Sequence, residues 1–141
     1  MCVSRETGRL VASGIGHQNK VLGLAWSGKG QLVLVGVKFV RFLHVEGRAL
    51  KAHAGVLGKE GAVQTFCSVA FVGEDAVVGT ASGHLYRFQA RQLVQVVQAH
   101  GVNEPVLSLF AVPPESKQLV SGGRDGLIIT WDSQLKPVGP P

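Results

Sequence analysis

Cysteine is scarce in this chain of 141 residues, which contains Cys2 and Cys67 and no other. The two match no CxxC pair and no zinc-ligand spacing, so the sequence supports neither a disulfide framework nor a metal site. We therefore expect a reduced, intracellular protein that carries no metal or other cofactor.

Long apolar runs are also missing. The most apolar stretch, residues 32–45, is interrupted by Lys38, Arg41 and His44 and is too short to cross a bilayer. The first residues are polar and charged, where a signal peptide would have an apolar core. The sequence therefore gives no reason to expect a membrane protein.

The remaining composition is typical of one folded domain. Apolar residues make up 45% of the chain, charged residues 16% and aromatic residues 6%, and 19 residues are Gly. This is enough apolar material for a core. Many glycines among Val and Leu predict short strands joined by tight turns.

A group of three short apolar segments occurs three times along the chain. The first segments cover residues 21–26, 66–71 and 106–111; the second cover 32–35, 76–78 and 118–121; the third cover 40–43, 85–88 and 128–131. Alternation and bounding turns favour strands over helices. With a linking strand at 48–53 and 93–98, each repeat has the size of one four-stranded propeller blade.

The third repeat resembles a WD40 repeat. His100 precedes its first segment, Ser121 and Asp125 flank a Gly-Gly-Arg turn, and Trp131 is followed by Asp132. The resemblance implies a structural relay in which Trp131 donates to Ser121, Ser121 to His100, and His100 to Asp125. Such a relay satisfies buried polar groups that would otherwise cost roughly 1–3 kcal/mol each.

The same polar residue types could suggest catalysis. A Ser-His-Asp triad is defined by its geometry and by an exposed nucleophile, not by residue types alone. We therefore expect His100, Ser121 and Asp125 to be structural and the protein not to be an enzyme. The other repeats lack the relay, with Leu34 and Leu43 in the first and Val78, Ser82 and Phe88 in the second, so we expect those blades to depend on apolar packing.

A narrower resemblance is to the echinoderm microtubule-associated protein-like family. It rests on residues 36–47, 55–59, 97–100 and 121–126 and extends from about Thr7 to Lys136. It implies a cytoskeletal protein of the cytoplasm that binds tubulin or microtubules through a propeller surface. The family usually has Trp where this chain has Leu43 and Phe88.

The net charge is unevenly distributed. Residues 1–60 contain nine Lys and Arg against three Glu, a net +6, whereas residues 61–141 contain five against six, a net −1. A basic half favours an acidic partner such as tubulin. The candidate contacts are Lys38, Arg41, Arg48, Lys51 and Lys59. We do not expect nucleic-acid binding, because strand alternation assigns Val40 and Phe42 to the core between blades and leaves charge as the only support.

These observations predict an all-β, WD40-type propeller of about three consecutive four-stranded blades, and therefore an incomplete ring. We expect the partial propeller at 1–133 and a Pro-rich tail at 134–141. Within it, an outer strand lies at 9–13 and blades at about 17–53, 62–98 and 100–133. A ring of four to eight blades needs further blades or another chain. The predicted function is a non-catalytic interaction scaffold for tubulin or microtubules. The alternative is a generic WD40 adapter for another protein complex.

Overall fold

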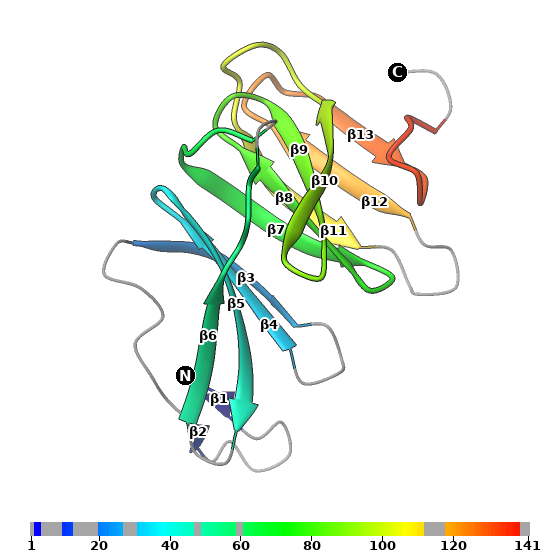
Figure 1. The fold of residues 1–141 in the computed structure, drawn as a ribbon. Coiled ribbons are helices and arrows are strands. Elements are labelled where there is room, and N and C mark those ends of the chain that lie inside the picture. The colour runs from blue at the N-terminus through cyan, green and yellow to red at the C-terminus, as the bar shows by residue number, and fades with distance from the viewer. Residues whose placement is uncertain are drawn as a thin grey trace.

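The computed structural model describes residues 2–3, 10–12, 20–26, 31–46, 49–58, 61–111 and 118–138. Within these ranges every regular element is a β-strand, and the all-β prediction is confirmed. The strands form three larger antiparallel sheets and one small one, arranged as a fan in Figure 1.

Each larger sheet is a meander in which consecutive strands pair. Sheet 1 consists of β3 (Val21–Trp26), β4 (Gln31–Gly36), β5 (Phe39–Glu46) and β6 (Ala49–Ala54). Sheet 2 consists of β7 (Phe66–Val72), β8 (Asp75–Thr80), β9 (His84–Gln89) and β10 (Gln92–Gln98). Sheet 3 consists of β11 (Val106–Ala111), β12 (Leu119–Gly123) and β13 (Ile128–Trp131). Residues 10–12 of the predicted outer strand form β2 (Leu10–Ala12), which pairs with β1 (Cys2–Val3).

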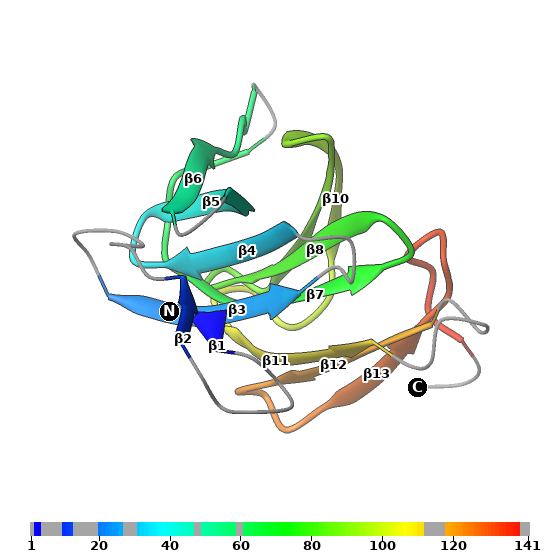
Figure 2. The ribbon, with the colours of Figure 1, turned by 90° about the horizontal axis from the view of Figure 1, so that it is seen from below.

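The first strand of each sheet lies on the inside of the fan. Strand β7 contacts β3 on one side and β11 on the other, and Figure 2 shows the three strands next to one another. The remaining strands of each sheet run outward from this centre. This arrangement is consistent with consecutive blades of an incomplete propeller.

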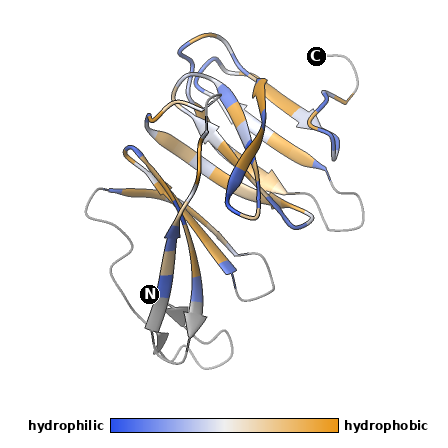
Figure 3. Ribbon diagram, viewed as in Figure 1, coloured by the Kyte–Doolittle hydropathy of each residue, from blue (hydrophilic) through white to orange (hydrophobic). Residues whose placement is uncertain are grey.

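Two apolar cores lie between the sheets, and Figure 3 shows the hydrophobic residues that run along their strands. Between sheets 1 and 2, Val33, Val40 and Phe42 pack with residues such as Val78 and Phe88. Val40 and Phe42 thus lie in the core between two sheets, as expected from strand alternation. A second core between sheets 2 and 3 contains Val77, Leu85, Val106, Leu119 and Trp131.

Sheets 2 and 3 come closest at their inner strands. Ser68 Oγ on β7 donates a hydrogen bond of 2.8 Å to the main-chain oxygen of Val106 on β11. A Cβ atom at Gly79, which pairs with Ser68, would lie 2.8 Å from Cβ of Val106. Glycine at this position is therefore required for the close approach of the two sheets.

The outer face of sheet 3 repeats this arrangement. Ser68, Gly79 and Leu85 form a row across sheet 2 on the face that receives sheet 3. The matching row of sheet 3 consists of Ser108, Gly122 and Ile128. Ser108 and Ile128 are exposed, because no further sheet covers this row in the described structure.

Residues 132–138 fold back along the outer edge of β13. The Asp132 N–H donates to the Lys136 carbonyl at 2.9 Å, and the Val138 N–H donates to the Thr130 carbonyl at 2.8 Å. Leu135 is buried in the core between sheets 2 and 3. The described part of the predicted tail is therefore packed against both sheets.

Large apolar side chains are exposed on the outward faces of sheets 1 and 3. On sheet 1, Leu24 and Trp26 are 61% and 51% exposed, and on sheet 3, Phe110 and Ile128 are 67% and 79% exposed. These side chains lie on the faces that point away from sheet 2, since the buried faces of sheets 1 and 3 contact sheet 2. Exposed apolar faces of this kind are typical of surfaces that bind another protein surface.

We expect the 141-residue chain to self-associate through these faces. Replacing Phe110 and Ile128 with Ser and Thr should shift the protein toward monomer, because the variant exposes less apolar area. Light scattering over a range of concentrations measures this. A parent chain that remains a stable monomer at high concentration would contradict the prediction.

The packing of sheet 2 on sheet 3 predicts different costs for two matched glycines. Gly79→Ala should lower the free energy of unfolding by about 1–3 kcal/mol, because the new methyl group overlaps Val106. Gly122→Ala is the control. A Cβ there would meet only the Ser108 hydroxyl, at 3.0 Å, and we expect a smaller loss. Urea denaturation measures both, and equal losses would show that contact with Val106 does not set the cost at Gly79.

Candidate functional site

The structure brings together the four polar residues of the third repeat. Trp131 Nε1 lies 2.8 Å from Ser121 Oγ, and Ser121 Oγ lies 3.0 Å from His100 Nε2. His100 Nδ1 lies 3.0 Å from Asp125 Oδ1. The residues come from the end of β13, from β12, from the segment after β10 and from the turn between β12 and β13. They form one chain of hydrogen bonds, which we call the relay.

The direction of the relay follows from its donor groups. The Trp131 indole can only donate, so the Ser121 oxygen accepts from it. The Ser121 hydroxyl and His100 Nε2 form the next hydrogen bond, and the Nδ1–H of His100 donates to the Asp125 carboxylate. Every polar side-chain atom in the relay therefore has a partner.

Asp125 is the partly exposed end of the relay. Burial opposes ionisation of its carboxyl group, but hydrogen bonds from the Leu127 and Gly101 N–H groups and from His100 lower its pKa below the ordinary 3.8. Because the pKa is lower in the folded state, the ionised carboxylate stabilises the fold above pH 3.8. That contribution is lost as the pH falls through the lowered value.

The relay is closed to reactants. The residue exposures of Ser121 and His100 are 0% and 3%, so the Ser121 hydroxyl cannot meet a substrate. Gly123 leaves room for the imidazole, because a Cβ there would lie 2.5 Å from His100 Nδ1. The geometry is therefore that of a structural network and not of a nucleophilic site.

Comparison with known families agrees with this geometry. Residues 91–132 match the family model described as WD domain, G-beta repeat. The chain contains a WD40 repeat. The matched residues cover β10 of sheet 2 and all three strands of sheet 3, so the WD40 repeat joins two sheets. WD40 repeat domains are generally non-catalytic scaffolds that mediate protein–protein interactions.

Outside the WD40 repeat, the matching positions are apolar. Strand register aligns Leu34 and Val78 with Ser121. It likewise aligns Leu43 and Phe88 with Trp131, and all four of these apolar side chains are buried. These positions contribute apolar packing in place of a relay.

Sheet 2 nevertheless contains a polar network of its own, so the expectation of apolar packing alone was wrong for this blade. Ser82 Oγ lies 3.0 Å from Thr80 Oγ1 and 2.8 Å from His84 Nδ1. Gln64 Oε1 accepts from the Ser82 N–H, and Gln64 Nε2 donates to the Tyr86 hydroxyl. Sequence reasoning missed Gln64, because it lies before the repeat segment and matches no WD40 position.

The three candidate basic contacts that the structure describes do not form one patch. Lys38 is exposed at the β4–β5 turn, whereas Lys51 is exposed on β6 opposite His44. Arg41 pairs with Leu34 and lies on the other face of sheet 1 from Phe42. Arg48 and Lys59 lie outside the described residues. The basic residues of sheet 1 are thus divided between its two faces and one end.

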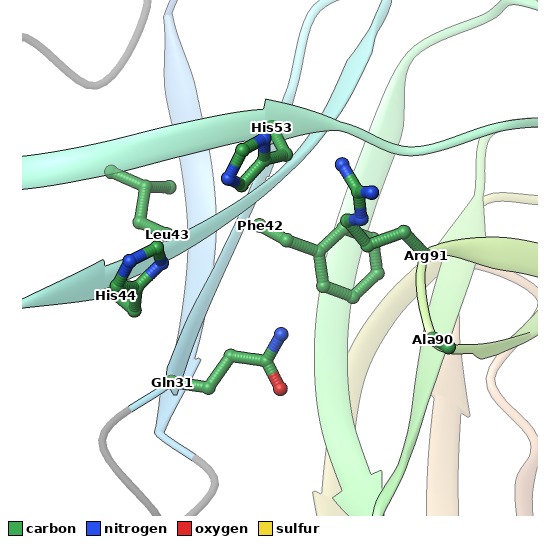
Figure 4. A pocket seen from close by; sticks show the side chains of 7 residues that line it. All are labelled: Gln31, Phe42, Leu43, His44, His53, Ala90 and Arg91. Atoms are coloured by element: carbon green, nitrogen blue, oxygen red, sulfur yellow. The ribbon is translucent and has the colours of Figure 1, made fainter.

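Other basic side chains do gather between sheets 1 and 2. A hollow of about 310 Å³ is lined by residues of β4, β5, β6 and the β9–β10 turn, and we call it the rim pocket. Its lining residues are Gln31, Phe42, Leu43, His44, His53, Ala90 and Arg91, shown in Figure 4. The His44 and His53 rings are stacked, with centroids 5.9 Å apart.

The described ranges contain no group of three or more His, Cys, Asp or Glu side chains placed to hold a metal ion. In the same part of the chain, no helix has the length and apolar character that a membrane span requires.

We expect Ser121→Ala to lower the free energy of unfolding by about 1–3 kcal/mol, because the Trp131 indole and the His100 imidazole lose a buried partner. Ser82→Ala is the control. Its hydrogen bonds to Thr80 and His84 are only partly buried, so water can replace the hydroxyl and the loss should be smaller. Thermal melts measure both variants. A larger loss for Ser82→Ala would assign the stabilising network to sheet 2 instead of the relay.

Proposed function

We propose that this protein is a non-catalytic scaffold of the cytoplasm and the cytoskeleton, and that tubulin or microtubules are its partner. The supporting observation is the WD40 repeat at residues 91–132, whose polar side chains hydrogen-bond to one another inside the fold. The sheets then serve to hold surfaces in place, which is the role of an interaction scaffold.

The sequence resemblance to the microtubule-associated family supports tubulin as the partner. Charge supports it as well, because residues 1–60 carry a net +6 and tubulin is acidic. The exposed Lys38 and Lys51 belong to this half. Exposed basic side chains attract an acidic surface and increase the rate of encounter.

A generic WD40 adapter for another protein complex is the second candidate function. The open apolar faces of sheets 1 and 3 favour it, since they offer contact area that does not depend on charge. The two candidates differ in salt dependence. Charge-driven binding weakens as the Debye length falls below about 8 Å, whereas apolar binding does not.

Co-sedimentation with microtubules, together with a pull-down of soluble tubulin, tests the proposal. We expect the protein to bind at low salt. Binding should be lost when Lys38, Arg41, Arg48, Lys51 and Lys59 are all replaced with Glu, because the reversals turn a net +6 into repulsion from an acidic partner.

The single variants Lys51→Glu and Lys136→Glu provide a matched pair, because both lysines are exposed but only Lys51 is in the basic half. Lys51→Glu should weaken binding more. Absence of binding by the parent protein at low salt would overturn the tubulin proposal in favour of the adapter. Binding that survives all five reversals would move the contact to another surface.

A further inference from the structure

The rim pocket has no part in the relay, and of its lining residues Phe42 and Leu43 also belong to buried apolar clusters. One wall is the β5–β6 pair, where His53 lies opposite Phe42 and Lys51 lies opposite His44. The other wall is the β9–β10 turn, which contributes Arg91. Residues from two sheets therefore meet at one hollow.

The lining side chains offer positive charge and hydrogen-bond donors. Arg91 carries a positive charge, the two imidazoles offer N–H donors, and Gln31 contributes an amide. No carboxylate is present among these seven lining residues. Lys51 is next to the pocket on the same face of β6 as His53, since alternate residues of a strand share a face. Such a surface attracts an anion.

Figure 4 shows how the side chains are directed. The Arg91 side chain points from its turn toward β5 and β6, where His53 lies, and the Gln31 amide points into the same space from β4. A guanidinium presents a planar fork of donors that matches a carboxylate or a phosphate.

The turn that carries Arg91 has an unusual backbone. Ala90 and Arg91 have φ of 49° and 74°, a region in which two-residue hairpin turns normally have Asn and Gly. Val56, which follows β6 of sheet 1, forms two hydrogen bonds at this turn. The Val56 N–H donates to the Arg91 carbonyl at 2.7 Å, and the Leu93 N–H donates to the Val56 carbonyl at 2.9 Å.

A bulky residue at φ of 74° has a strained backbone, and glycine at the same position would not. The cost is understandable if the Arg91 side chain has a ligand to bind. The hydrogen bonds of Val56 hold the turn against sheet 1, so the guanidinium faces β5 and β6 before any ligand arrives. Such preorganisation increases affinity.

We propose that the rim pocket binds one anionic side chain of a partner protein, a carboxylate or a phosphate. Arg91 is the main ligand, and His53 is a further donor. A volume of about 310 Å³ is at the lower end of ligand pockets and has room for one side chain. The inference depends on the proposed function only in requiring a protein partner, because the site itself does not require tubulin.

Fluorescence anisotropy with three labelled peptides tests the proposal. One peptide is Glu-rich, one carries a single phosphoserine in a neutral sequence, and one is the Gln-rich neutral counterpart. We expect the protein to bind the Glu-rich or the phosphoserine peptide, and the stronger of the two identifies the anion. Binding of the neutral peptide equal to that of both anionic peptides, or no binding of either, would overturn the proposal.

The decisive variant is Arg91→Gly. Glycine relieves the positive φ, so the melting temperature should stay the same or rise. Affinity for the anionic peptide should nevertheless fall about tenfold or more, because a charge-assisted hydrogen bond is lost. A loss of binding in a stable variant cannot be attributed to unfolding.

His53→Gln should give a smaller loss, and Lys136→Gln, which removes an exposed charge far along the chain, should give none. Unchanged binding in both Arg91→Gly and His53→Gln, or an equal loss in Lys136→Gln, would show non-specific charge attraction and overturn the site. The same variants are then tested by microtubule co-sedimentation. Peptide binding without microtubule binding rejects tubulin and keeps the pocket, whereas microtubule binding that Arg91→Gly leaves intact separates the two sites.

Discussion

The close approach of β7 and β11 is the contact on which the fan depends. At that point Gly79 has no side chain, Ser68 hydrogen-bonds to the Val106 carbonyl, and the apolar side chains of both sheets close around the pair. A strand pair is only marginally stable alone, so each sheet needs an apolar neighbour. The same row on sheet 3, with Ser108 and Gly122, is exposed. The row that lets sheet 3 pack on sheet 2 therefore has a counterpart on the outward face of sheet 3.

The relay and the apolar core stabilise the arrangement of strands in different ways. Apolar burial is non-directional and tolerates several arrangements of strands. The relay is directional, since the Trp131 indole, the Ser121 hydroxyl and the His100 imidazole satisfy one another in a single geometry. It joins the segment after β10 to β12 and β13, and so orders the sheet that has three strands. Sheet 2 reaches a comparable result through Gln64 and Ser82, with different residues.

A scaffold of this type leaves its outer surfaces available for binding. The polar residues that resemble a catalytic set are enclosed, whereas the basic side chains of sheet 1 and the rim pocket are at the outside of the fan. Binding and stability then make different demands on neighbouring residues. Arg91 illustrates this, because its backbone conformation would suit glycine while its side chain faces the pocket. The positive φ of Arg91 costs backbone energy that glycine would avoid.

The sequence by itself determined the strand pattern, the repeat length and the residue types of the relay. All of these are local or periodic: alternation sets the buried face, and a repeat of about 44 residues brings His100, Ser121 and Trp131 to fixed places in one blade. Tertiary structure alone decided which distant residues meet. Gln31, His53 and Arg91 share a pocket because two sheets pack together, and Lys38 and Lys51 are separated because one lies in the β4–β5 turn and the other on β6. Leu135 is buried because its segment folds back on β13. Such long-range pairings depend on how sheets pack, and no periodicity in a single chain encodes them.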